Sequence, residues 1–203
     1  MNTLSIRKKP KQLRSMNMLN DIYSGVLRGV QKYGLENLST TKISKLTGIS
    51  VGSFYQYFIN KESLFLELSK HLSLDISNEL NQLITDSKFE LNERVEMALS
   101  RYIDYFFEHE DFFKVLYSTY LTNGFKEKVL ERRKVFCETL ANELSQNSHK
   151  SKEDCLIFAT CLINSVNGAL HMFAQDSKRQ VTKNEIKAFL IQSVRNSINI
   201  IQI

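Results

Sequence analysis

The chain has 203 residues, which is enough for one or two small domains with a sizeable core. It contains one proline and seven glycines, and this scarcity of helix breakers favours an all-α chain. The formal charge of +5 is unevenly placed: residues 1–61 hold ten Lys or Arg and two acidic residues, a balance of +8, whereas the remainder carries −3. A basic N-terminal part on a mildly acidic remainder suits phosphate binding by the N-terminal part alone.

The first residues, MNTLSIRKKP, lack the apolar stretch of a secretory signal. No apolar run approaches the ~18 residues that span a membrane, so we expect a cytoplasmic protein with no membrane partner. The basic run Arg7-Lys8-Lys9 is either solvated charge or a flexible arm that touches DNA. The three cysteines lack CxxC spacing, which favours buried reduced thiols over a redox switch; they are Cys137, Cys155 and Cys161.

The first expected helix runs from about Lys11 to Tyr33, and two short helices follow within residues 38–64, LSTTKISKLTGISVGSFYQYFINKESL. Ser39 and Ser50 are placed to cap these two helices, because a serine hydroxyl can accept a hydrogen bond from a free backbone N–H. Gly48 supplies the permissive backbone that ends the first of them. The pattern predicts a helix-turn-helix whose second helix enters the DNA major groove.

A longer order of residues surrounds this motif. It comprises Ile22, Gly34, Ser39, Ile43, Gly48, Ile49, Ser50, Gly52, Ser53, Phe54, Tyr55, Tyr57, Phe58, Lys61, Glu62 and Leu64. Over about residues 15–66, this order and spacing resemble the DNA-binding domain of the TetR family of bacterial transcriptional regulators. The resemblance implies a three-helix DNA-binding domain over residues 1–62. A helical effector-binding and dimerisation domain follows over residues 63–203, with about nine helices in total.

The resemblance also implies that Tyr55, Tyr57 and Lys61 contact phosphates and the groove. Tyrosine hydroxyls reach phosphate oxygens, and a lysine at a helix start adds to a site that already favours anions. Each tyrosine has the alternative of packing inside the domain. The other expected DNA-binding residues occupy the starts of the two short helices and the middle of the second; they are Thr40, Thr41, Ser50, Val51, Gly52, Ser53 and Gln56.

Two of these residues have specific expectations. Val51 stands where the family commonly has a polar or basic residue, and its side chain can pack on a thymine methyl. Gln56 can pair with adenine, reach the backbone or remain in solvent.

Beyond the motif, apolar residues at helical spacing predict further helices. A long one from Lys61 to about Thr85 would join the two domains, and the others cover residues 91–109, 112–121, 125–146, 152–176 and 182–201. The helix over 152–176 is apolar nearly all round, so it needs cover on several sides. Pairing with the last helix and with the same two helices of a second copy would form a four-helix, two-fold interface. The expected interface residues are Leu162, Val166, Gly168, Ala169, Phe173, Phe189, Leu190, Val194 and Ile198.

The second domain is rich in aromatic residues and contains a polar stripe, Asn164, Asn167 and His171, within an apolar helix. Buried polar groups need partners, and these are a bound ligand, the opposing subunit or internal waters. The aromatic residues are either plain core or the wall of a cavity for a lipophilic effector. The expected ligand-binding residues are Tyr102, Phe106, Phe113, Tyr117, Tyr120, Asn164, Asn167 and His171.

The sequence lacks GxSxG, HExxH, a phosphate-cradling glycine loop and zinc-ligand spacing, so we expect neither an enzyme nor a cofactor. We expect a homodimeric, sequence-specific regulator of transcription that binds a palindromic operator in double-stranded DNA. By resemblance it is a repressor, released when a small lipophilic effector binds the C-terminal domain. Two alternatives stay open: a TetR-like regulator controlled by a protein partner or without an effector, and a helical carrier of hydrophobic ligands.

Overall fold

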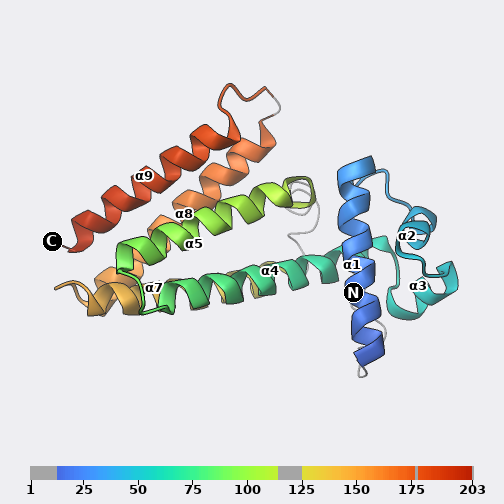
Figure 1. Ribbon diagram of the computed structural model, residues 1–203, viewed down its shortest axis with the longest axis horizontal. Helices are drawn as coiled ribbons and strands as arrows, with labels where there is room; N and C mark the ends of the chain where they lie inside the picture. The colour runs from blue at the N-terminus through green and yellow to red at the C-terminus, as the bar shows by residue number, and fades with distance from the viewer. Residues whose placement is uncertain (1–12, 114–124, 177, 203) are drawn as a thin grey trace. The chain divides into compact units, whose positions relative to one another are not determined.

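The computed structural model describes residues 13–113, 125–176 and 178–202, and within these ranges the regular structure is helical throughout. The expectation of an all-α chain is confirmed (Figure 1). The helices are α1 (Leu13–Tyr33), α2 (Thr40–Thr47), α3 (Val51–Tyr57), α4 (Lys61–Thr85), α5 (Leu91–Glu108), α7 (Phe125–Gln146), α8 (Lys152–Gln175) and α9 (Lys183–Gln202). The expected aromatic helix over 112–121 lies outside the described residues after Phe113.

The chain divides into two compact units. The first, called the head below, comprises Met1–Leu72 and Asp111–Lys126; the second, called the body, comprises Ser73–Glu110 and Glu127–Ile203. The head therefore includes the first half of α4 as well as the three preceding helices.

Local chemistry explains where the short helices of the head begin and end. The Ser39 hydroxyl accepts a hydrogen bond from the Lys42 N–H at 3.2 Å, and the Ser50 hydroxyl accepts one from the Ser53 N–H at 3.0 Å. Each bond satisfies one of the free N–H groups at a helix start. Gly48 ends α2 with a φ of +72°, a left-handed conformation that glycine adopts without strain. The capping roles expected from the sequence are confirmed.

Two glycines bring α1 close to α2. A Cβ built on Gly25 would lie 2.4 Å from the Cγ2 atom of Thr47, and one built on Gly29 would lie 2.7 Å from the Cδ1 atom of Leu46. A side chain at Gly25 would clash with Thr47, and one at Gly29 would require the end of the Leu46 side chain to move. These close contacts fix α2, and with it the turn to α3, against the long first helix.

The core of the head combines side chains from all four of its helices. Its fully buried members include Ile22, Val26, Leu38, Ile43, Phe54, Phe58, Leu64 and Leu68. Phe112, which follows α5 in the chain, is also part of the head; its ring meets the ring of Phe65 edge-on at 6.4 Å between centroids. A later segment of the chain therefore completes the core of the N-terminal unit.

In the body, α5 lies along α9, and α8 also packs on α9 (Figure 1). Polar contacts run the length of the α5–α9 pair. The Lys187 ammonium binds both carboxylate oxygens of Asp104, at 2.5 and 2.6 Å, and Arg195 binds Glu96. The apolar side of α9 is buried below them.

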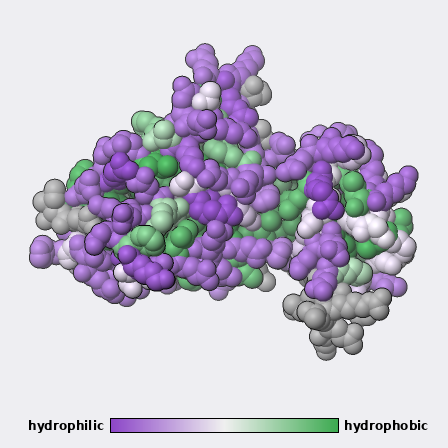
Figure 2. Space-filling model, in the orientation of Figure 1, coloured by the Kyte–Doolittle hydropathy of each residue, from purple (hydrophilic) through white to green (hydrophobic). Residues whose placement is uncertain are grey.

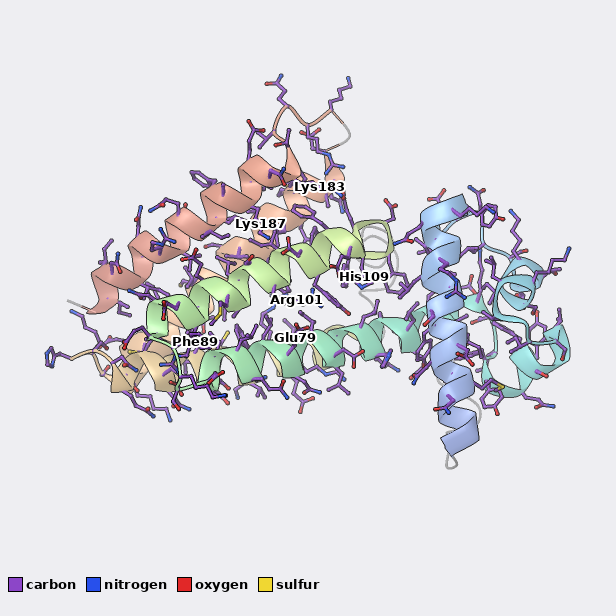
Figure 3. The ribbon with its side chains drawn as sticks, viewed as in Figure 1. Glu79, Phe89, Arg101, His109, Lys183 and Lys187 are labelled. Atoms are coloured by element: carbon purple, nitrogen blue, oxygen red, sulfur yellow. The ribbon has the colours of Figure 1, made fainter. Side chains whose placement is uncertain are left out.

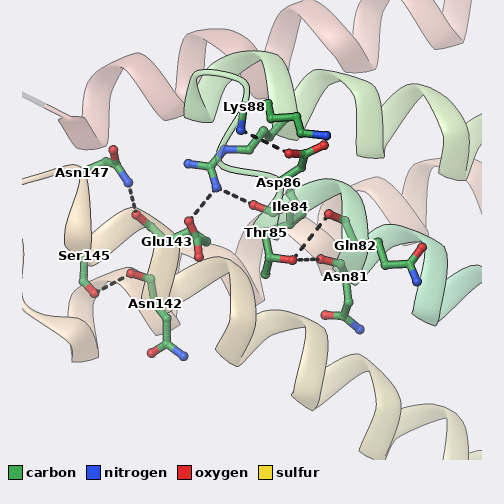
Figure 4. Close-up of polar contacts among 11 residues, drawn as sticks. Asn81, Gln82, Ile84, Thr85, Asp86, Lys88, Asn142, Glu143, Ser145 and Asn147 are labelled. Carbon is green, nitrogen blue, oxygen red and sulfur yellow. Dashed lines mark hydrogen bonds and ion pairs between the residues drawn. The ribbon is translucent and has the colours of Figure 1, made fainter.

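A buried arginine joins three helices of the body. The Nη1 atom of Arg94 donates hydrogen bonds to the carbonyl oxygen of Ile84 and to the Glu143 carboxylate, each at 2.6 Å (Figure 4). The carbonyl belongs to the last turn of α4, where backbone acceptors lack helical partners. The side chain is almost fully buried, so these two bonds hold the end of α4, the start of α5 and α7 together.

Helix α8 corrects one expectation from the sequence. By length and composition it could cross a membrane, which no apolar run was expected to do. Polar residues such as Asn164 and Asn167 interrupt its apolar run, although the mean hydropathy over the helix remains high. Only 28% of its apolar window is buried in this chain, which leaves a large apolar surface without cover.

Candidate nucleic-acid interface

Helix α3 presents one face to solvent. Val51 and Tyr55 are 40% and 44% exposed, and Gly52 and Gln56 are exposed beside them. Residues four apart lie above one another on a helix, so these side chains form one continuous surface. Ser53 is half-buried at its edge, where its hydroxyl shares a 2.9 Å hydrogen bond with that of Ser50. The exposed surface is free of charged side chains.

The two expected tyrosine contacts differ in position. Tyr55 is on the exposed face, and its ring stands edge-on to Phe54 at 5.3 Å. Tyr57 points the other way and is only 9% exposed. Its ring is therefore part of the head core, which was the alternative for both tyrosines. The physical reason is the helical rotation, because residues two apart face different sides.

Three lysines supply positive charge on α2 and α4, the helices that flank α3 in the chain. Lys61 is half-buried in the first turn of α4, where the Asn60 side chain accepts a 2.8 Å hydrogen bond from the Ser63 N–H. Lys42 and Lys45 are exposed on α2. These side chains, together with the N-terminal ends of the helices, favour anions.

Lys42 was not among the residues expected from the sequence. Its ammonium donates a 3.0 Å hydrogen bond to the carbonyl oxygen of Asn37 and lies 5.3 Å from the centre of the Tyr33 ring. Thr41, its neighbour, is exposed, and Thr40 is half-buried. Lys42 directly follows the two threonines at the start of α2, and this position in the sequence could have identified it as a candidate DNA contact.

In the body, four of the expected ligand-binding residues come together. The Tyr102 hydroxyl donates a 2.5 Å hydrogen bond to the Asn167 side-chain oxygen, and the Asn167 amide donates to the carbonyl oxygen of Ile163 at 2.7 Å. His171 meets the ring of Phe106 edge-on at 5.5 Å. These contacts join α8 to α5.

Burial, followed by the positive charge of Arg133, lowers the pKa of His171 to about 4. The imidazole is therefore neutral at pH 7 and offers one donor and one acceptor nitrogen. Arg133 also donates a 3.1 Å hydrogen bond to the side-chain oxygen of Asn164, which is exposed. The polar stripe expected on α8 thus divides, with Asn167 and His171 directed to α5 and Asn164 to α7.

Of the three other expected ligand-binding residues, the structure describes one. Phe113 belongs to the head, where its ring lies 6.3 Å from that of Phe112. Tyr117 and Tyr120 lie outside the described residues.

The profile of a family described as bacterial regulatory proteins, tetR family, matches residues 27–68, from the middle of α1 into α4. Residues 27–68 of this chain are therefore similar to the DNA-binding part of the TetR family. Over 160 residues it is 26% identical to the nucleoid occlusion factor SlmA of Vibrio atlanticus (strain LGP32), covering 74% of this chain and 81% of that protein. The resemblance found in the sequence is confirmed, and the chain is a DNA-binding regulator.

Two solved structures show the TetR-type fold over nearly the whole chain. A TetR-family transcriptional regulator from Pectobacterium atrosepticum has a TM-score of 0.73 at 10% identity, covering 96% of this chain and 98% of that one. The transcriptional regulator FadR from Bacillus subtilis, in complex with stearoyl-CoA, has a TM-score of 0.64 at 16% identity, covering 88% and 96%.

The residues expected at the dimer interface differ in how deeply they are buried within the single subunit. Five of them are buried within the single subunit, namely Val166, Phe173, Leu190, Val194 and Ile198. Leu162 and Ala169 are half-buried, while Gly168 and Phe189 are exposed. The buried five form the contact of α8 and α9 with the rest of the body, so they are not a free surface for a partner.

Besides Phe189, apolar residues that were not in the expected set are exposed on the same helices. On α8, Ile157 and Met172 are 58% and 72% exposed, with Cys161 between them. On α9, Phe189 and Ile200 are 69% and 72% exposed. An apolar helix has no pattern that distinguishes its two sides, and this is why the sequence did not separate the two sets.

Proposed function

We propose that this chain is a homodimeric repressor of transcription that binds a near-palindromic operator and leaves it when a lipophilic effector binds the body. The observation that carries the proposal is the exposed face of α3. It belongs to a head whose residues 1–61 carry a net charge of +8, with lysines on the flanking helices α2 and α4. This arrangement suits insertion of α3 into the major groove with phosphate contacts around it.

Within this proposal the head residues have separate roles. Thr40, Thr41, Lys42, Tyr55 and Lys61 contact phosphates, because each offers a hydroxyl or ammonium donor near the helix starts. Those facing the bases are Val51, Gly52, Ser53 and Gln56. Val51 contacts a thymine methyl, and Gln56 reads the edge of a base. Ser50 caps α3, and Tyr57 supports the helix from within the core.

The exposed apolar residues of α8 and α9 support the dimer. Ile157, Cys161, Gly168 and Met172 follow one side of α8 at spacings of four and seven, and a Cβ on Gly168 would meet nothing within 4 Å. Exposed apolar residues grouped in this way are typical of a protein–protein interaction site. A second copy covers it through the same two helices, as a two-fold interface requires.

The cluster of Tyr102, Phe106, Asn167 and His171 supports an effector site in the body. Its aromatic walls suit an apolar chain, and a neutral His171 with Asn167 offers a small number of polar anchors. The Bacillus subtilis relative of this fold holds stearoyl-CoA. Long-chain acyl thioesters are therefore the first class of effector to test.

A second candidate function is regulation without a small effector. The Asn167 side chain is already satisfied by Tyr102 and the Ile163 carbonyl, so it needs no ligand. The sequence relative with 26% identity is named a nucleoid occlusion factor, not an effector-controlled repressor. This name supports a regulator that acts without a small effector. The two candidates differ in whether stearoyl-CoA changes DNA affinity.

Salt-dependent binding to duplex DNA distinguishes the proposed repressor from a helical carrier of hydrophobic ligands. We expect the logarithm of the binding constant to fall linearly with the logarithm of salt concentration, by roughly 0.9 for each phosphate neutralised. Stearoyl-CoA should then lower the DNA affinity of the repressor. Absence of DNA binding at low salt would contradict the proposal; unchanged affinity with stearoyl-CoA would favour the second candidate.

A further inference from the structure

An open groove runs along the body between α4 and α5, at the place marked by Glu79, Phe89 and Arg101 in Figure 3. Its volume is about 720 Å³. The α4 side is formed by Glu79 and Leu83, and the loop before α5 contributes Phe89. On α5 the lining residues lie between Glu93 and Asp104 at spacings of one, three and four, so they share one face of the helix.

The floor of the groove is apolar. Phe89 is 44% exposed, although it is a large aromatic residue, and Leu83 and Met97 are half-buried next to it in the lining. Figure 2 shows hydrophobic residues gathered on this part of the body with hydrophilic residues around them. An exposed apolar patch with a polar rim is typical of a surface that binds a partner.

The rim of the groove is acidic. Glu79, Glu93, Glu96 and Asp104 line it, against the single cation Arg101. Three of these carboxylates already have cationic partners in the body: Glu79 binds Arg101 at 2.7 Å, and Glu96 and Asp104 bind residues of α9. These pairs hold the walls in place.

The end of the groove near Phe89 has unneutralised negative charge. Glu90 and Glu93 are exposed there and form a capping box, in which the Glu93 carboxylate accepts the Glu90 N–H at 3.1 Å. Among the ion pairs of the described residues, none includes either carboxylate. An exposed aromatic residue close in the chain to two such carboxylates suits a partner that is both apolar and positively charged.

We propose that this groove is a docking surface for an amphipathic helix of a partner protein. The apolar side chains of that helix pack on Leu83, Phe89 and Met97, and its Lys or Arg side chains face the acidic rim. The α5 face from Glu93 to Asp104 covers twelve residues, or roughly 17 Å for the rises of about 1.5 Å between them, which matches three turns of a bound helix. The groove is open along its length, unlike the enclosed pockets that bury small molecules. The residues that line the groove are different from the exposed residues of α3, α8 and α9 and from the proposed effector cluster.

The test uses the full chain and a displayed pool of random peptides of about 16 residues, long enough for four helical turns. We expect selection of peptides with apolar residues three and four apart, flanked by Lys or Arg. Their affinity is then measured by fluorescence anisotropy for wild type and Phe89→Ser. Leu74→Ser is the matched control, because Leu74 is 43% exposed on α4 and does not line the groove.

We expect Phe89→Ser to raise the Kd by about tenfold or more, as loss of an aromatic anchor does, and Leu74→Ser to leave it unchanged. Glu93→Gln, which keeps an acceptor for the capping box, should slow association at low salt, whereas Glu131→Gln on α7 should not. Hydrogen exchange of the bound complex should be slowed in residues 79–104. Met97→Gln repeats the test if Phe89→Ser does not fold.

Three results would overturn the proposal. One is a set of selected peptides that bind Phe89→Ser or Met97→Gln as tightly as wild type. Another is protection of α8 and α9 in place of residues 79–104. The third is binding of the lipophilic cation tetraphenylphosphonium in the groove with no peptide enriched, which would assign the groove to a small ligand. DNA binding is measured for each variant as well. A variant that still binds DNA but not the peptide has lost only docking, whereas absence of DNA binding in the wild type would contradict the proposed regulator.

Discussion

The hydroxyl of Tyr102 donates a 2.5 Å hydrogen bond to the side-chain oxygen of Asn167, and this bond satisfies a polar group that is only 8% exposed inside the body. It also joins the middle of α5 to the middle of α8. The neighbouring contact of His171 with Phe106 joins the same two helices. A substitution in this cluster would therefore alter the packing of both helices.

Tyr102→Phe should destabilise the chain by about 1–3 kcal/mol, because it leaves the Asn167 oxygen buried without a donor. Urea denaturation followed by circular dichroism measures the change. The double variant Tyr102→Phe with Asn167→Leu should recover part of the loss, since both polar partners are then removed. An additive loss in the double variant would show that the hydrogen bond is not the source of the effect.

Gly25→Ala should destabilise the head, although alanine is otherwise favoured over glycine in a helix by about 1 kcal/mol. The new Cβ would lie 2.4 Å from the Cγ2 atom of Thr47, and α1 and α2 would have to separate. Gly52→Ala is the control, because its Cβ would make only an ordinary 3.7 Å contact with the Ser50 hydroxyl oxygen. Thermal unfolding should show a lower Tm for the first variant and an equal or higher Tm for the second; equal stability of the two would contradict the close contact.

Much of the head was predictable because its signals are local. Ser39, Ser50 and Gly48 act on backbone groups within a few residues, so their caps follow from the sequence alone. The buried pair of Arg94 and Glu143 joins residues 49 positions apart, and nothing in either local sequence indicates it.

The candidate site was predictable in part for a similar reason. The position of Tyr55 on the exposed side of α3 follows from helical spacing, and so does the burial of Tyr57 once the core side is known. The core side itself is set by packing against other helices. On α8 the apolar residues surround the axis, so the sequence contained no information on which of Val166 and Met172 faces solvent.

Lys61→Gln and Tyr55→Phe should weaken binding to all duplex sequences by a similar factor, because phosphates are the same at every base pair. Lys61→Gln should also reduce the salt slope by about one unit. Binding of several unrelated duplexes at two salt concentrations measures both effects. A loss confined to one base pair would contradict the phosphate role, whereas Val51→Ala should change base preference.

Phe189→Asp and Met172→Asp should each convert the proposed dimer to a monomer, because they place a charge on the apolar surface that we propose a second copy covers. Analytical ultracentrifugation of the purified chain measures the change in mass. Val135→Asp on α7 is the control, since Val135 is also exposed, at 49%, but lies outside the proposed interface. A dimer that persists in both variants would place the interface elsewhere.

The stability of the chain should fall on acidification between about pH 6.5 and pH 4, the ordinary and the folded pKa values of His171. In this interval the unfolded imidazole binds a proton that the folded one does not, so the free energy of unfolding rises with pH. Burial also lowers the pKa of His109, which adds to the same trend. His171→Asn should reduce the difference between urea midpoints at pH 7 and pH 5; an unchanged difference would exclude His171 as its source.

The central claim is that two copies of the exposed α3 face read a two-fold operator. Selection of bound sequences from a random duplex pool, repeated at two salt concentrations, tests it most directly. We expect a near-palindromic motif whose half-sites are about one helical turn apart, 34–36 Å, or a multiple of it, recovered at both salt concentrations. Recovery of duplexes with no shared motif, or of a single unrepeated half-site, would contradict the claim.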